Sequence, residues 1–180
     1  MSKYFRWKFG IGLLISFLFL GYLYSQDNLA DPLKPLQPLL GKTWKGTFSN
    51  STPEKPMYDI SRWERALNGQ AIRILHSVND GEYGGETLLF WDSEKKKLVY
   101  YYFTTAGFYT NGTMTVEEGK YISHEYVIGN QKGITEVKST GEMLENGKLH
   151  AKSKYLKSGA WIDGHEIEYV EDNSAEVIFK

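Results

Sequence analysis

Histidine is the side chain in this sequence with the widest chemical use, and its four copies differ in their surroundings. His76 shares one face of a predicted strand with Ile72 and Ile74, because residues two apart in a strand point the same way. That apolar face predicts an interior position for the His76 ring. His150 alternates with lysines and is expected to face water. No two histidines have the spacing of a zinc-binding pair, so the sequence assigns no metal ligands.

Charged side chains within the predicted strands are a second polar feature. Arg62 and Glu64 share a face with Ile60 and Ala66. Inside a barrel this pair would orient a polar group of a ligand, whereas on the outer wall it would face solvent, and the sequence leaves both open. No carboxylate pair is selected for glycosidase chemistry, and no Gly-x-Ser-x-Gly motif is present. The GEYGG stretch lacks the Lys-Ser/Thr of a phosphate-binding loop, so no catalytic residue is assigned.

Tyrosine is unusually common, with 13 copies in a chain that is 15% aromatic. Buried tyrosine hydroxyls need hydrogen-bond partners, so these residues serve binding faces as well as cores. Tyr100 and Tyr102 lie in the run 99–103, which is rich in β-branched and aromatic residues. Both are candidate ligand-binding residues, together with Trp44.

Short strands and tight turns must position these side chains. Asn79, Asp80 and Gly81, and then Gly84 and Gly85, are turn residues between aromatic segments. Turns recur roughly every 8–12 residues, as in an all-β barrel or sandwich. Closure into an antiparallel up-and-down barrel of roughly ten strands would remove exposed edges. The expected strands are 57–66, 70–78, 86–92, 98–104, 108–116, 120–128, 134–140, 149–156, 160–162 with 166–170, and 175–179.

Composition narrows the classes of partner. The chain has 180 residues, which suits one domain, and its net charge is −1. That balance argues against a nucleic-acid surface, which needs clustered positive charge. The absence of cysteine excludes disulfides, thiolate-held zinc and thiol catalysis.

The N-terminal segment differs from the rest of the chain. Residues 1–25 combine a basic start with a short apolar run, which predicts a secretory signal peptide or, if uncleaved, an inner-membrane anchor. The protein is therefore expected to be exported, periplasmic or secreted. Residues 26–38 are proline-rich and predict an extended linker. Leu36, Leu39 and Leu40 are expected to form a helical turn that plugs one end of the domain 39–180.

The stretch GKTWKG at 41–46 resembles the opening of the first barrel strand in the calycin superfamily, which includes lipocalins and fatty-acid-binding proteins. The run 67–92, with its Gly-Gly-Glu and Trp-Asp, resembles a bacterial lipocalin-like family of unknown function. This resemblance covers roughly residues 36–180 and implies an up-and-down barrel. The chain has no Arg after Arg73, so it lacks the late arginine with which fatty-acid-binding proteins grip a carboxylate.

Nitrobindin-type haem barrels share the short helix and the Gly-x-Trp-x-Gly start. Such relatives imply a ten-stranded barrel and a haem held by one His near the C-terminal strands. Among the histidines of this chain, His165 fits that position, and haem needs only one protein axial ligand.

The sequence leaves several functions open. The first is an exported lipocalin-like protein that binds a small apolar or aromatic ligand in its barrel. The alternatives are a haem barrel of nitrobindin type, a filled barrel that serves the envelope or protein interactions, and an enzyme that no motif supports. A membrane contact is expected only through residues 1–25, and the oligomeric state stays open. The candidate ligand-binding residues are Trp44, Arg62, Glu64, His76, Tyr100 and Tyr102, with His165 as the candidate haem ligand.

Overall fold

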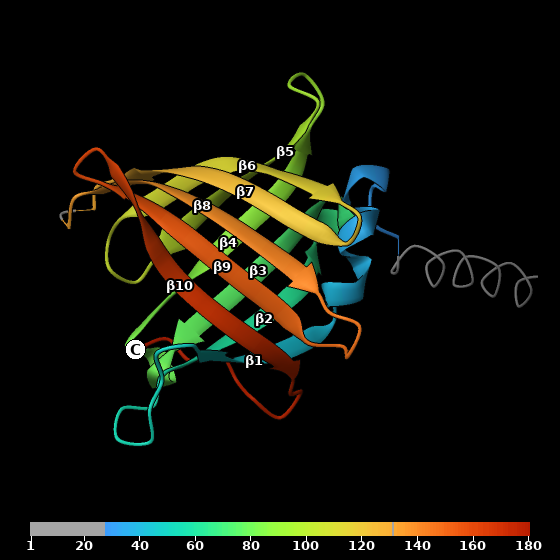
Figure 1. Ribbon diagram of the computed structural model, residues 1–180. Helices are drawn as coiled ribbons and strands as arrows, with labels where there is room; N and C mark the ends of the chain where they lie inside the picture. Colours follow the sequence, from blue (N-terminus) through green and yellow to red (C-terminus); the bar gives the residue numbers. More distant parts are fainter. Residues whose placement is uncertain (1–27, 131) are drawn as a thin grey trace, which may run out of the picture.

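The computed structural model describes residues 28–130 and 132–180, which form a closed antiparallel barrel (Figure 1). The predicted signal or anchor segment, residues 1–25, lies outside the described residues. Each strand pairs with its neighbours along the chain, and β1 pairs with β10 to close the sheet. The all-β, ten-stranded prediction is therefore confirmed. The strands are β1 (Lys42–Phe48), β2 (Tyr58–Ala66), β3 (Ala71–Val78), β4 (Tyr83–Asp92), β5 (Lys97–Thr104), β6 (Tyr109–Glu117), β7 (Lys120–Ile128), β8 (Ile134–Met143), β9 (Leu149–Lys157) and β10 (Ala160–Glu171).

One end of the barrel is closed by a 3-10 helix, η1 (Asp31–Leu39), in the segment that was expected to be an extended linker. Its sequence repeats Pro-Leu-x three times, and a 3-10 helix has three residues per turn, so the three leucines fall on one face. The prolines favour this conformation because their fixed φ suits it. Leu33, Leu36 and Leu39 are buried in the core. Two of these residues, Leu36 and Leu39, belong to the helical turn that the sequence predicted to plug this end.

Trp44 anchors this closed end. Its side chain is 1% exposed, and its indole Nε1–H donates a hydrogen bond to the Leu39 carbonyl oxygen at 3.2 Å. Trp44 and η1 thus hold each other in place at the start of β1.

Two glycines predicted to lie in a turn lie instead in β4. The turn is the short 3-10 element η3 (Asn79–Gly81), and Gly84 and Gly85 follow within the strand. A Cβ atom at Gly85 would lie 2.2 Å from the Phe103 carbonyl oxygen of β5 and 2.4 Å from the Tyr102 ring. Gly85 is therefore needed for the close approach of β5 and the Tyr102 ring, and not for a bend.

The strand expected at 175–179 is also absent from the structure. After β10, the chain crosses the outside of the barrel without strand pairing and ends beside the turn between β3 and β4 (Figure 1). The Ile178 N–H donates to Ser77 Oγ at 3.0 Å. Since β1 and β10 already pair, the closed sheet has no edge for another strand.

Candidate ligand-binding cavity

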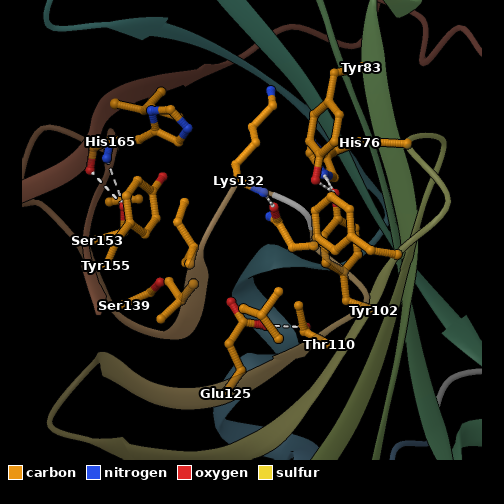
Figure 2. Close-up of a pocket in the computed structure, with 18 of the residues that line it drawn as sticks. His76, Tyr83, Tyr102, Thr110, Glu125, Lys132, Ser139, Ser153, Tyr155 and His165 are labelled. Carbon is orange, nitrogen blue, oxygen red and sulfur yellow. Dashed lines mark hydrogen bonds between the residues drawn. The ribbon is translucent and has the colours of Figure 1, made fainter. Parts of the chain in front are cut away.

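A cavity of about 860 Å³ lies inside the barrel and opens at the end opposite η1. Its mouth is formed by the β5–β6 loop at Gly107 and Phe108 and by the β7–β8 loop at Gly129 and Asn130. Lys132 lies at this mouth (Figure 2). The interior walls come from eight of the ten strands, β3 to β10, and combine aromatic and aliphatic side chains with several polar groups.

The first polar group is a histidine paired with a buried carboxylate. His76 Nδ1 lies 2.8 Å from Asp59 Oδ1, and the Asp59 residue is 3% exposed. The other carboxylate oxygen, Oδ2, accepts a hydrogen bond from the Tyr169 hydroxyl at 2.8 Å. Asp59 is thus satisfied on both oxygens, and it fixes the orientation of the His76 ring.

Two tyrosines extend this pair into the cavity. His76 Nε2 lies 2.6 Å from the Tyr102 hydroxyl, which lies 2.9 Å from the Tyr83 hydroxyl (Figure 2). Burial raises the pKa of Tyr102 and of Tyr83, so both hydroxyls stay protonated at neutral pH. The result is one continuous chain of hydrogen bonds that leads from Asp59 to Tyr83 at the cavity wall.

The direction of this chain depends on the proton count of His76. In the neutral ring, Nδ1–H donates to Asp59, so Nε2 accepts from Tyr102, and Tyr83 then donates to Tyr102. In the protonated ring, Nε2–H donates to Tyr102, which donates to Tyr83 and leaves the Tyr83 proton free. Tyr83 can therefore present an acceptor or a donor to a bound molecule.

The second polar group is a carboxyl on β7. Glu125 accepts a hydrogen bond from the Thr110 hydroxyl, through a short contact, and the nearby Tyr100 hydroxyl acts to lower the pKa of Glu125. Figure 2 shows its carboxyl group directed into the cavity. Burial raises the pKa of Glu125, because the low-dielectric wall disfavours the charged form.

The third polar group is His165 on β10. Its ring makes edge contacts with Phe48 and Tyr155, at centroid distances of 5.1 and 5.5 Å. The backbone N–H of His165 donates to Ser153 Oγ at 2.7 Å. Burial lowers the pKa of His165, which favours the neutral ring. Within residues 28–130 and 132–180, no hydrogen bond reaches either of its ring nitrogens.

Glycines that face the interior shape the cavity wall. A Cβ at Gly141 would lie 1.9 Å from the Tyr121 ring, and a Cβ at Gly164 would lie 2.8 Å from the Tyr155 ring. In each case the glycine lets a neighbouring tyrosine lie flat along the wall.

Five of the predicted site residues lie in or near the interior. His76, Tyr102 and His165 line the cavity. Tyr100 is buried, and its hydroxyl contacts the carboxyl of Glu125 from the wall. Trp44 lies in the core at the closed end and does not line the cavity.

Arg62 and Glu64 lie on the outer face of β2, so the structure does not bring them to the cavity. Side chains alternate along a strand, and Asp59 and Trp63 occupy the inner face. Arg62 Nε pairs with Glu64 Oε1 at 2.8 Å, and Arg73 lies 3.7 Å from the other Glu64 oxygen. The outer-wall reading of the pair is therefore the correct one.

Asp59, Tyr83 and Glu125 are site residues that the sequence did not single out. Tyr83 stood in the expected GEYGG turn, and Glu125 was one of several carboxylates in strands. Among the described residues, no group of three or more potential metal ligands gathers at one place. None of the helices in the described ranges has the length and apolar character to cross a bilayer.

Comparisons with known proteins bear on the fold. No family model matches this chain, and no curated protein sequence matches it. The crystal structure of Rv2717c from M. tuberculosis is similar, with a TM-score of 0.56 and 14% sequence identity. The match covers 82% of this chain and all of that one. At this identity the likeness shows a shared barrel fold, and the lipocalin-like family stays a prediction.

Proposed function

We propose that this protein binds a small apolar or aromatic molecule inside its barrel. The observation that carries the proposal is the open cavity of about 860 Å³. Ligand sites in proteins commonly measure roughly 300–1,000 Å³ and combine apolar walls with a few well-placed polar groups. Here the aromatic wall would bury the ligand body, and the Tyr83 hydroxyl would fix one polar atom as donor or acceptor.

The proposal includes export, on the evidence of the sequence alone. Residues 1–25 have the pattern of a signal peptide or anchor. In the periplasm or outside the cell, free apolar molecules partition into membranes. A protein with such a cavity would instead keep its ligand in solution. Fractionation of cells that express the full chain tests this part, and a purely cytoplasmic product would contradict it.

Ligand binding is tested by titration of the purified full chain with N-phenyl-1-naphthylamine, a neutral apolar dye. We expect saturable, one-to-one enhancement of the dye fluorescence. Ser139→Phe fills the cavity from β8 and should abolish the enhancement. Thr115→Phe adds the same ring at an exposed position of β6 and should retain it. Equal fluorescence in both variants would contradict the proposal and favour the filled-barrel or enzyme alternatives.

Haem is the second candidate, and the state of His165 favours it. A neutral imidazole at the cavity, with no hydrogen bond to its ring nitrogens among the described residues, is the form that ligates iron. His165 would hold the iron, and the aromatic walls would cover the macrocycle. The cofactor would supply redox or small-gas chemistry when bound.

Titration with haemin tests this second candidate. A Soret band that appears with wild type and is lost in His165→Ala would support it, whereas His76→Ala should retain the band. Unchanged spectra in the single alanine variants of all four histidines would contradict haem ligation by this chain.

A further inference from the structure

We infer that the cavity selects ligands with a positively charged nitrogen, and that Glu125 is the group that receives it. This inference rests on the proposed ligand-binding function and specifies its ligand class: a small aromatic amine. It starts from Glu125, the carboxyl among the described cavity-lining residues, which forms no ion pair with a neighbouring side chain.

Position is the first step. Glu125 lies on the inner face of β7, opposite Gly112 of β6, where a Cβ would approach the Glu125 Cβ to 2.8 Å. Because Gly112 has no side chain, the carboxyl is not covered from that side. Thr110 and Tyr100 hold it from the wall, and the carboxyl group points into the open space (Figure 2).

Charge is the second step. Asp59, the other acidic side chain of the interior, has His76 as its partner at 2.8 Å. Among residues 28–130 and 132–180, no Lys, Arg or His side chain forms an ion pair with Glu125. Of the other basic residues that line the cavity, Lys152 pairs with Glu166 at 2.8 Å, and Lys132 is exposed at the mouth. Burial disfavours the protonated ring of His165. His76 and His124 act on Glu125 electrostatically without forming an ion pair with it, so a ligand cation would supply the direct counter-charge.

The energetics favour a cation over other ligands. An ionised carboxylate in a low-dielectric wall costs free energy unless a charge and hydrogen bonds compensate it. An ammonium group would offset that cost directly. The rings of Tyr83, Tyr102 and Phe108 line the same cavity and add the attraction of aromatic faces for cations. A ligand carboxylate would instead meet a like charge.

The test compares three probes that share one ring system: 2-naphthylmethylamine, 2-methylnaphthalene and 2-naphthylacetate. Calorimetric titration of the purified full chain at pH 7.5 should show the amine binding at least tenfold more tightly than the other two. Glu125→Gln should remove the preference for the amine and leave the affinity for 2-methylnaphthalene unchanged. The retained neutral probe also shows that the variant is folded.

Two further variants sharpen the test. Glu136→Gln removes a carboxylate on the outer face, where it pairs with His124, and should keep the amine preference. Ser139→Lys places a cation in the cavity wall and should shift the preference towards 2-naphthylacetate.

The outcomes separate the two proposals. Equal affinity for the three probes, or an amine preference that survives Glu125→Gln, would overturn the role of Glu125 while leaving ligand binding intact. Failure of all three probes to bind wild type would overturn the proposed function and this inference with it.

Discussion

His76 and Asp59 lie on adjacent strands with Nδ1 and Oδ1 2.8 Å apart, and this contact joins the buried core to the cavity. The same carboxylate holds Tyr169 of β10, so one side chain connects three strands around the barrel closure. The cavity wall and the stability of the fold therefore depend on a common residue.

Removal of the Asp59 carboxylate should cost stability. Asp59→Ala leaves Nδ1 of His76 and the Tyr169 hydroxyl without their acceptor, and unsatisfied buried groups cost about 1–3 kcal/mol each. Urea denaturation should show a lower free energy of unfolding. Asp163→Ala, at a side chain that is 95% exposed, should change it by less than about 0.5 kcal/mol. Similar losses in the two variants would contradict the structural role of Asp59.

The glycine at position 141 should not tolerate a methyl group. Gly141→Ala would place its Cβ 1.9 Å from the Tyr121 ring, and overpacking of this kind costs about 1–3 kcal/mol. Truncation of the ring in Tyr121→Ala should relieve the clash. In a double-mutant cycle, the two losses should therefore be strongly non-additive. Additive losses would mean that the two residues do not pack as described.

An indole N–H helps to hold the helix η1 at the closed end, beside the buried leucines. Trp44→Phe removes the hydrogen bond to the Leu39 carbonyl and part of a buried ring, so we expect a loss of about 1–3 kcal/mol. Thermal denaturation of the variant and of wild type measures this loss of stability. Trp161→Phe is the matched control, because Trp161 is 39% exposed, and its melting temperature should stay near that of wild type.

The outer-face ion pairs should be irrelevant to ligand binding. Arg62→Gln and Glu64→Gln change a network that also includes Arg73 and lies outside the barrel. Exposed pairs contribute about 0–1 kcal/mol, so stability should change little. Dye affinity should equal that of wild type in both variants. A tenfold loss of affinity in either would show that this face takes part in binding.

Stability should depend on pH through Glu125. Burial raises the pKa of Glu125 in the folded chain above its ordinary value of 4.5. At a pH between 4.5 and the folded-state pKa, the folded chain therefore holds a proton that the unfolded chain has released. The contribution of Glu125 to stability is therefore fully present below pH 4.5 and is lost as the pH rises through the folded pKa. Urea denaturation from pH 4 to 8 should show Glu125→Gln gaining stability relative to wild type across that interval. Glu176→Gln, in the exposed tail, should follow the wild-type profile, and a constant offset in Glu125→Gln would contradict the assignment.

Most of the strands could be predicted because the local signals act within each segment. Alternating aromatic and β-branched residues, interrupted by Asn-Gly and Asp-Gly turns, fix where a strand begins and ends without any knowledge of its neighbours. The 3-10 helix was harder, since three prolines read equally as an extended linker. Its signal was the spacing of three between Leu33, Leu36 and Leu39, which matches the 3-10 turn.

The inner and outer faces of the strands could not be predicted in the same way. Along β2, Arg62 and Glu64 fit one face of a strand, and Asp59 and Trp63 fit the other face equally well. Only pairing with the neighbouring strand decides which face points into the barrel. Here Arg73 on β3 lies directly opposite Glu64 and gathers the charges outside. The signal that was overlooked is glycine: Gly85, Gly112 and Gly141 mark the inner face, because tyrosine rings or the Cα and Cβ atoms of Glu125 lie directly beside them.

The tail after β10 decides where the two ends of the described chain leave the barrel. An even number of strands returns the chain to the pole where it started, beside η1, but residues 172–180 then run back along the wall to the mouth (Figure 1). The chain before Asn28 joins at the closed pole, where Arg65 Nε donates to the Asn28 carbonyl oxygen. If the protein were tethered to a surface through the chain before Asn28, the mouth of the cavity would face away from that surface. A bulky fusion after Lys180 would instead stand next to the entrance, so the choice of tag end alone should alter the rate at which a ligand enters.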